Sequence, residues 1–131
     1  MSYDKRPVNQ VGCSDDVVLG PAISAALSGR RVVAVECYPG VRFEDVRAVL
    51  QADLVVDVSR AYLASEVLDA LVAEELTDDP IFGRLSQRTV VDFFDPEALG
   101  LLRERVAGSD GTVAVIGTGA SLVAHDLLVY A

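Results

Sequence analysis

Apolar residues run almost without interruption through three short segments, and these predict buried strands. The segments are 31–38 (RVVAVECY), 54–58 (LVVDV) and 112–116 (TVAVI). Strands that are apolar at nearly every position are buried on both faces, as in parallel sheets. Residues 127–131 (LLVYA) predict a further strand, and residues 89–94 predict a short one.

Helical periodicity separates these strands. Helices are predicted at residues 21–27, 43–50, 62–76 and 96–107, and the longest carries one apolar stripe, made of Leu63, Val67, Leu68, Leu71 and Val72. Because strands alternate with helices, the chain is expected to form an α/β fold with three layers, a parallel sheet flanked by helices, joined by right-handed crossovers.

The chain of 131 residues fits one domain. Residues 1–16 are polar and predict an N-terminal arm, so the single α/β domain is expected at 17–131. The last predicted strand stops at Ala131, with no helix after it to cover it. This pattern favours a fragment of a longer chain over an edge strand.

Composition excludes several classes of protein. Hydrophobic residues make up 51% of the chain, yet no apolar run approaches the roughly 18 residues that span a membrane. Met1 to Gln10 lack the apolar core of a secretory signal, and the two cysteines, Cys13 and Cys37, form no disulfide framework. A cytoplasmic location is therefore expected, with no membrane partner.

The net charge of −9 is unevenly distributed, because residues 66–131 hold twelve of the 20 acidic side chains and only four of the 11 basic ones. An acidic surface repels phosphate backbones, so nucleic acid is excluded as a partner. Whether the chain forms a homo-oligomer is left open.

The segment 39–44 lies between a predicted strand and a predicted helix, where kinases hold phosphate. A working Walker A loop needs glycines, a lysine and a hydroxyl. Here Gly40 is present, but Arg42, Phe43 and Glu44 stand in place of glycine, lysine and hydroxyl. Gly40 and Arg42 are candidates for binding phosphate, whereas Arg42 could also be a solvated partner of Glu44 or Asp45.

Other candidate residues have two interpretations each. Asp57 ends a strand, where it could hold a metal or act as a base, or could cap the next turn. Arg84, Ser86 and Arg88 could bind phosphate, or could pin their loop to Asp78 or Asp79 by ion pairs. For three further features the structural interpretation is favoured: Cys37 as a packed thiol, His125 as a surface or capping residue, and Gly117 to Ala120 as a tight turn.

Several segments together resemble one family. They are ECYPGV (36–41), TDDPIFGRLS (77–86), VVDFFD (90–95), IGTGASLV (116–123) and DLLVYA (126–131). They resemble the bacterial long-form class I mannose-6-phosphate isomerases, in which a nucleoside-kinase-like domain precedes a catalytic cupin domain. The resemblance covers roughly residues 31–131 and implies a P-loop-kinase-like fold without a working Walker A loop.

The resemblance also implies an activity that this chain does not itself carry. Members of that family interconvert mannose 6-phosphate and fructose 6-phosphate with a zinc ion held in the cupin. This chain has one histidine and no clustered ligands for zinc. It is therefore expected to be a non-catalytic domain without a cofactor of its own, which contacts its cupin and could bind a sugar phosphate or a nucleotide.

Two other functions are left open. One is a small phosphotransferase that uses Asp57 with a divergent phosphate loop. The other is an interaction module whose acidic second half docks a basic partner.

Overall fold

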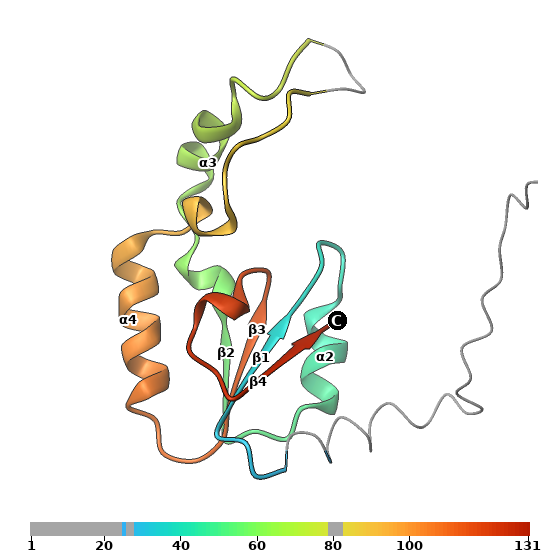
Figure 1. Ribbon diagram of the computed structural model, residues 1–131, viewed down its shortest axis with the longest axis vertical. Coiled ribbons are helices and arrows are strands. Elements are labelled where there is room, and N and C mark those ends of the chain that lie inside the picture. Colours follow the sequence, from blue (N-terminus) through green and yellow to red (C-terminus); the bar gives the residue numbers. More distant parts are fainter. Residues whose placement is uncertain (1–24, 26–27, 79–82) are drawn as a thin grey trace, which may run out of the picture.

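Four parallel strands form the centre of the protein (Figure 1). A computed structural model describes residues 25, 28–78 and 83–131, so the predicted arm and most of the first predicted helix lie outside the described residues. The strands are β1 (Val32–Glu36), β2 (Leu54–Asp57), β3 (Val113–Gly117) and β4 (Leu127–Tyr130), in the order β2-β3-β1-β4. The predicted α/β class with a parallel sheet is confirmed.

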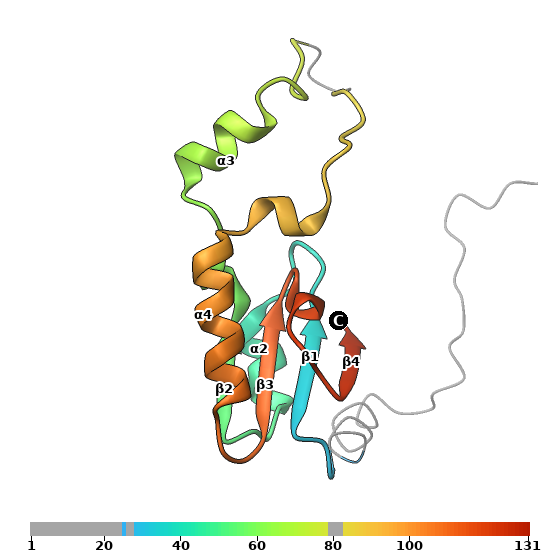
Figure 2. The same cartoon turned by 60° about the vertical axis from the view of Figure 1, so that its left-hand side comes forward.

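One helix packs on each face of the sheet (Figures 1 and 2). Successive side chains of a strand point to opposite faces. Val33 and Val35 of β1 therefore pack with α2 (Phe43–Val49). Val32 and Ala34 pack with α4 (Pro96–Ala107) on the other face. The three layers follow from this alternation.

The termini of α4 match the sequence signals. The Asp95 carboxylate accepts hydrogen bonds from the backbone N–H groups of Glu97 and Ala98, both at 2.9 Å. Pro96 occupies the first turn, where its missing N–H has no helical partner in any case, and Gly108 ends the helix. Leu99, Leu102 and Val106 are buried against the sheet.

The predicted strand at 89–94 is wrong. Val90–Phe93 form a 3-10 helix, η2, because the Asp92 carboxylate accepts hydrogen bonds from the N–H (2.7 Å) and hydroxyl (3.0 Å) of Thr89. This local capping box outweighs the strand propensity of the two valines. Only Phe94 pairs, in a single antiparallel bridge with Tyr62.

The predicted helix at 62–76 is shorter than expected. A 3-10 turn, η1 (Val58–Ala61), comes directly after β2, and α3 spans only Ser65–Val72. None of the residues of α3 is buried, because the helix projects beyond the end of the sheet, where no described strand faces it (Figure 1). The apolar stripe therefore predicts a helix correctly but not a buried one. Among the described residues, no helix is long and apolar enough to cross a membrane.

Candidate functional site

The strand order places a crevice between the carboxyl ends of β1 and β3. The chain leaves β1 over the α2 face to reach β2, whereas it leaves β3 over the α4 face to reach β4. Two neighbouring strands whose connections diverge in this way define the point where α/β proteins bind ligands. The segments that border the crevice are residues 37–42 and 118–121.

The carboxylate of Glu36 joins the end of β1 to the segment at 118–121. Glu36 is the last residue of β1, and its side chain accepts hydrogen bonds from the backbone N–H groups of Gly119 and, at 2.9 Å, of Ser121. Gly117 and Gly119 have φ values of 124° and 91°, so the segment turns tightly, as predicted, and aims its N–H groups inward. An anion of the protein itself occupies the position in which phosphate binds in phosphate-binding turns.

One further hydrogen bond joins the two segments, and another ties residue 118 to Tyr62. The hydroxyl of Thr118 donates to the carbonyl oxygen of Cys37 at 2.7 Å. The hydroxyl of Tyr62, which follows η1, donates to the carbonyl oxygen of Thr118 at 2.8 Å. These bonds leave little room for a ligand to part the two segments.

Cys37, which follows Glu36, is a packed thiol of the core on the α2 face, as predicted. Its exposed fraction is 1%, and its thiol lies 3.5 Å from the carbonyl oxygen of Val35. Burial raises the pKa of the Cys37 thiol, and the carboxylates of Glu36 and Asp57 raise it further. The thiol is therefore protonated and a poor nucleophile at neutral pH.

An apolar pocket of about 400 Å³, which we call the edge pocket, opens above the crevice. The ring of Phe94 meets the ring of Tyr62 edge to face, with centroids 4.8 Å apart. Three further apolar residues are exposed near the carboxyl ends of the strands or in η2. They are Tyr38, which follows β1, Tyr130, which ends β4, and Val90, which begins η2. The lining residues of the edge pocket are Pro39, Tyr62, Leu68, Val90, Phe93, Phe94 and Thr118.

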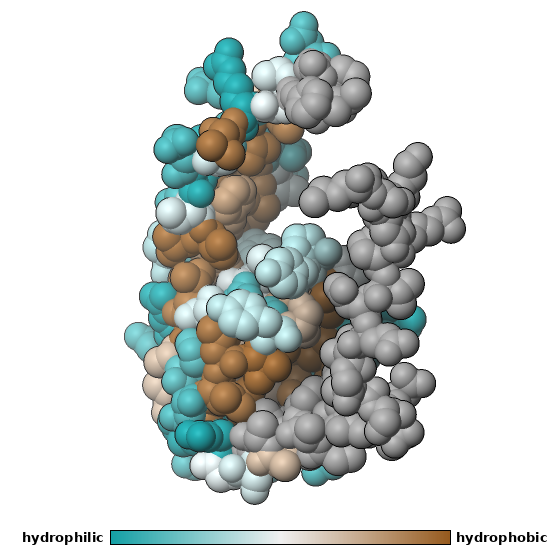
Figure 3. All heavy atoms as spheres, turned by 45° about the vertical axis from the view of Figure 1, so that its right-hand side comes forward, coloured by the Kyte–Doolittle hydropathy of each residue, from teal (hydrophilic) through white to brown (hydrophobic). Residues whose placement is uncertain are grey.

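Apolar surface extends beyond the edge pocket. In Figure 3, which brings the β4 side forward, apolar side chains gather over the sheet and continue along the segment that carries α3.

The carboxylates that act on Tyr62 are those of Asp57 and Glu36. Burial raises the pKa of the Tyr62 hydroxyl, and the nearby carboxylates of Asp57 and Glu36 contribute to the same shift. No basic side chain is among those that line the edge pocket. The arrangement therefore favours an uncharged apolar group over a phosphate.

Gly40 and Arg42 lie in the turn after β1. The N–H of Val41 donates to the carbonyl oxygen of Tyr38 at 3.1 Å, and Gly40 has a φ of 100°, which favours glycine. The guanidinium of Arg42 lies 3.5 Å from the Asp45 carboxylate, and the Arg42 side chain is 76% exposed. Arg42 thus adopts the solvated, paired arrangement that was one of its two interpretations.

Asp57 caps the turn that follows its strand. Its carboxylate accepts a hydrogen bond from the N–H of Ser59 at 2.9 Å. This is the capping geometry that the sequence allowed as an alternative to metal binding. Across the described residues, no group of three His, Cys, Asp or Glu side chains could hold a metal ion.

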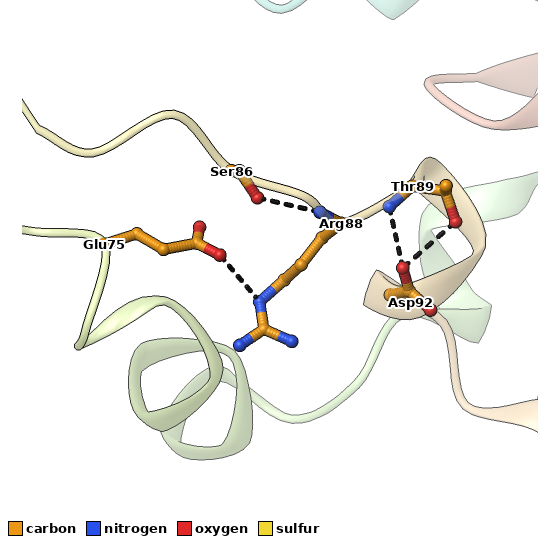
Figure 4. A network of polar contacts seen from close by, with 5 residues as sticks. All are labelled: Glu75, Ser86, Arg88, Thr89 and Asp92. Carbon is orange, nitrogen blue, oxygen red and sulfur yellow. Dashed lines mark hydrogen bonds and ion pairs between the residues drawn. The ribbon is translucent and has the colours of Figure 1, made fainter.

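Arg84, Ser86 and Arg88 belong to the segment between α3 and η2, and Figure 4 shows the contacts of Ser86 and Arg88. The guanidinium of Arg88 lies 3.1 Å from the Glu75 carboxylate, and the hydroxyl of Ser86 accepts from the N–H of Arg88 at 3.1 Å. The N–H of Arg84 donates to the carbonyl oxygen of Glu75 at 2.8 Å. The expected ion pair is present, but its partner is Glu75 rather than Asp78, and Asp79 lies outside the described residues.

The predicted site residues do not form one site. Within the described ranges, no hydrogen bond or ion pair joins the turn at Gly40 and Arg42 to the segment at 84–88. Sequence reasoning missed Glu36, Tyr62 and the role of Thr118. One signal could have indicated Glu36: it is an acidic residue at the end of an apolar strand, in a chain that also has a glycine-rich turn after a parallel strand.

The fold and this edge define the class of the protein, which is an α/β domain with a parallel sheet whose switch-point crevice is closed by its own side chains. The chain belongs to the family described as a domain of unknown function (DUF8485), which matches residues 20–131. No curated protein and no solved structure matches the chain.

Proposed function

We propose that the chain is a non-catalytic, kinase-like domain of a mannose-6-phosphate isomerase polypeptide. The observation that carries the non-catalytic part is the carboxylate of Glu36, which takes up the N–H groups of Gly119 and Ser121. The isomerase part rests on the sequence segments that resemble that family.

The turn at 38–42 supports the same proposal. It offers neither a lysine nor a serine or threonine hydroxyl for a triphosphate and magnesium. Its one cation, Arg42, is paired with Asp45 and largely exposed. A nucleotide at this edge would place its phosphates beside Glu36 and Asp57, which would repel them.

Zinc chemistry is assigned to a region outside these 131 residues. The described residues offer no group of three ligands that fits zinc. Under the proposal the aldose–ketose isomerisation takes place in a cupin, and this domain contributes a packing surface. The complete reading frame tests this part, and a frame that encodes no cupin refutes it.

A thermal-shift experiment tests the non-catalytic part. ATP with magnesium at about one hundred times its dissociation constant would stabilise the domain by about 2.7 kcal/mol, which raises Tm by several degrees in a domain of this size. We expect no such rise at millimolar Mg·ATP. ATP with EDTA is the matched control, and a magnesium-dependent rise would count against the non-catalytic part and favour the competing phosphotransferase function.

A further inference from the structure

A second hollow, larger than the edge pocket, lies along the α4 side of the sheet. Its volume is about 690 Å³, and it opens between the last turns of α4, the start of β1 and the connection from β3 to β4. We call it the α4 hollow. Its walls include Arg31, Arg103, Val106, Leu122 and His125.

Arg31 is held in place by the end of α4. One terminal nitrogen of its guanidinium, Nη2, donates to the carbonyl oxygens of Ala107 at 2.7 Å and Ser109 at 2.8 Å. These carbonyls lie at the C-terminus of the helix, where the helix dipole favours a cation. The side chain is therefore fixed before any ligand arrives.

Arg103 is held by the connection from β3 to β4. Its Nε and Nη2 both donate to the carbonyl oxygen of Leu122, at 3.0 Å and 2.7 Å. Arg103 comes from α4 and Leu122 from η3 (Ala120–Leu122), so this contact ties the helix to the connection that crosses the sheet.

The partners of both guanidinium groups are neutral carbonyls. In the described part of the chain, neither Arg31 nor Arg103 forms an ion pair, although other arginines do. Each also keeps N–H groups on Nη1 that no described group accepts. Two fixed cations with spare donors are what an oxyanion requires.

The other side chains that line the α4 hollow indicate what the uncharged part of a ligand would be. His125 Nδ1 lies 2.7 Å from the carbonyl oxygen of Val123, which fixes the ring and leaves Nε2 as its second polar atom. Val32, Val106 and Val123 are buried residues that line the same space. A hollow of this volume with an apolar floor and a few fixed polar groups has the character of a small-molecule site.

We infer that the α4 hollow binds a small molecule with an anionic head on an apolar body, in which Arg31 and Arg103 hold the head. The inference does not depend on the proposed isomerase function, because it uses no contact of the edge pocket or of the turn at 38–42. The net charge of the chain is −9, so an anionic ligand needs a locally positive region, and Arg31 and Arg103 provide one.

Titrations followed by NMR test the inference with defined probes. Phenyl phosphate tests a phosphate as the anionic head, and benzoate tests a carboxylate. Phenol has the apolar ring without an anionic group. We expect saturable shifts for the amides of residues 121–125 and for the Nε–H groups of Arg31 and Arg103. Phenol should bind at least about tenfold more weakly than the better of the two anions, because it lacks the charge-assisted hydrogen bonds.

Variants separate a site from a general charge effect. Arg103→Gln should weaken binding of the better probe about tenfold or more, and Ala124→Phe should block the hollow without a change of charge. Arg105→Gln removes the same charge from the same helix at a residue that does not line the hollow, so it should change the affinity less than twofold.

Two results of these experiments would refute the binding site. Equal losses in the Arg103 and Arg105 variants would overturn the inference, as would unsaturable shifts spread over the whole chain. If Arg103→Gln fails to fold, Ala124→Phe still decides, because residue 124 is exposed and unchanged binding in that variant would refute the site.

Discussion

Replacing Glu36 tests the idea that a carboxylate of the chain closes the crevice. Glu36→Ala removes the acceptor for two N–H groups. Gly119 is buried, so its N–H would be left without a partner at a cost of about 1–3 kcal/mol, whereas water can reach exposed Ser121. We therefore expect a loss of about 2 kcal/mol in the free energy of unfolding, which lowers Tm by roughly 7 °C.

Urea unfolding followed by circular dichroism measures this loss. Glu36→Gln keeps one oxygen acceptor, so it should cost about half as much as the alanine variant. The matched control is Glu104→Ala, an exposed glutamate of α4, which should change stability by less than about 0.5 kcal/mol. Hydrogen exchange gives a local reading, because the Gly119 amide should lose its protection in Glu36→Ala.

Equal stability of the Glu36→Ala and Glu104→Ala variants would refute the reasoning. So would a Gly119 amide that exchanges as slowly in the alanine variant as in the wild type. In either case the carboxylate would not be what holds the turn, and the main support for a non-catalytic edge would be lost.

Three other variants test the packing and electrostatics of the same fold. Gly119→Ala should cost about 3 kcal/mol in urea unfolding, because φ is 91° and a Cβ there would lie 2.5 Å from the Phe94 ring. Backbone N–H groups at the start of β1 hold the pKa of Asp126 below its usual value. Asp126 therefore stabilises the fold above about pH 4, and this stability is lost as pH falls through its lower folded pKa; Asp126→Asn should flatten the acid side of a stability–pH curve. In a Cys13→Ser background, Cys37 should react with a disulfide reagent far more slowly than in denaturant, because burial raises its pKa; fast reaction of the folded protein would contradict its burial.

The sheet could be predicted from the sequence because its strands carry a strong signal. Val32 to Val35 and Val113 to Ile116 are apolar on both faces, which suits a strand covered by helices on both sides. The start of α4 was equally clear, because Asp95 and Pro96 act locally and need no tertiary partner. An element can be predicted from the sequence when its local propensity and its place in the fold favour the same structure.

The segment between α3 and η2 shows why other elements could not be predicted. Val90 and Val91 suggest a strand, yet a strand needs a neighbour, and the Thr89–Asp92 capping box supplies a helical turn without one. The apolar stripe of α3 suggests a buried helix, but burial depends on whether the sheet extends beneath it, and that is a property of the whole fold.

Glu36 could have been found only with the topology in hand. Side chains alternate along a strand, so Glu36 points to the same face as Ala34, which is the face of α4. The β3–β4 connection crosses that face, as Ala120 and Val123 in the same core show. The sequence alone shows that Glu36 ends a strand, but the strand order decides that it meets Gly119.

The edge pocket and the α4 hollow therefore differ in the ligands they admit. Glu36 takes up the N–H groups of Gly119 and Ser121 that would otherwise attract an anion, whereas the guanidinium groups of Arg31 and Arg103 form no ion pair within the described residues. A phosphorylated compound that binds this domain should then perturb residues 121–125 and leave the turn at 38–42 unchanged. An apolar, uncharged partner should do the reverse and contact the edge pocket at Phe93 and Phe94. One spectrum with each kind of probe thus distinguishes a domain that binds metabolites from one that only packs against another domain.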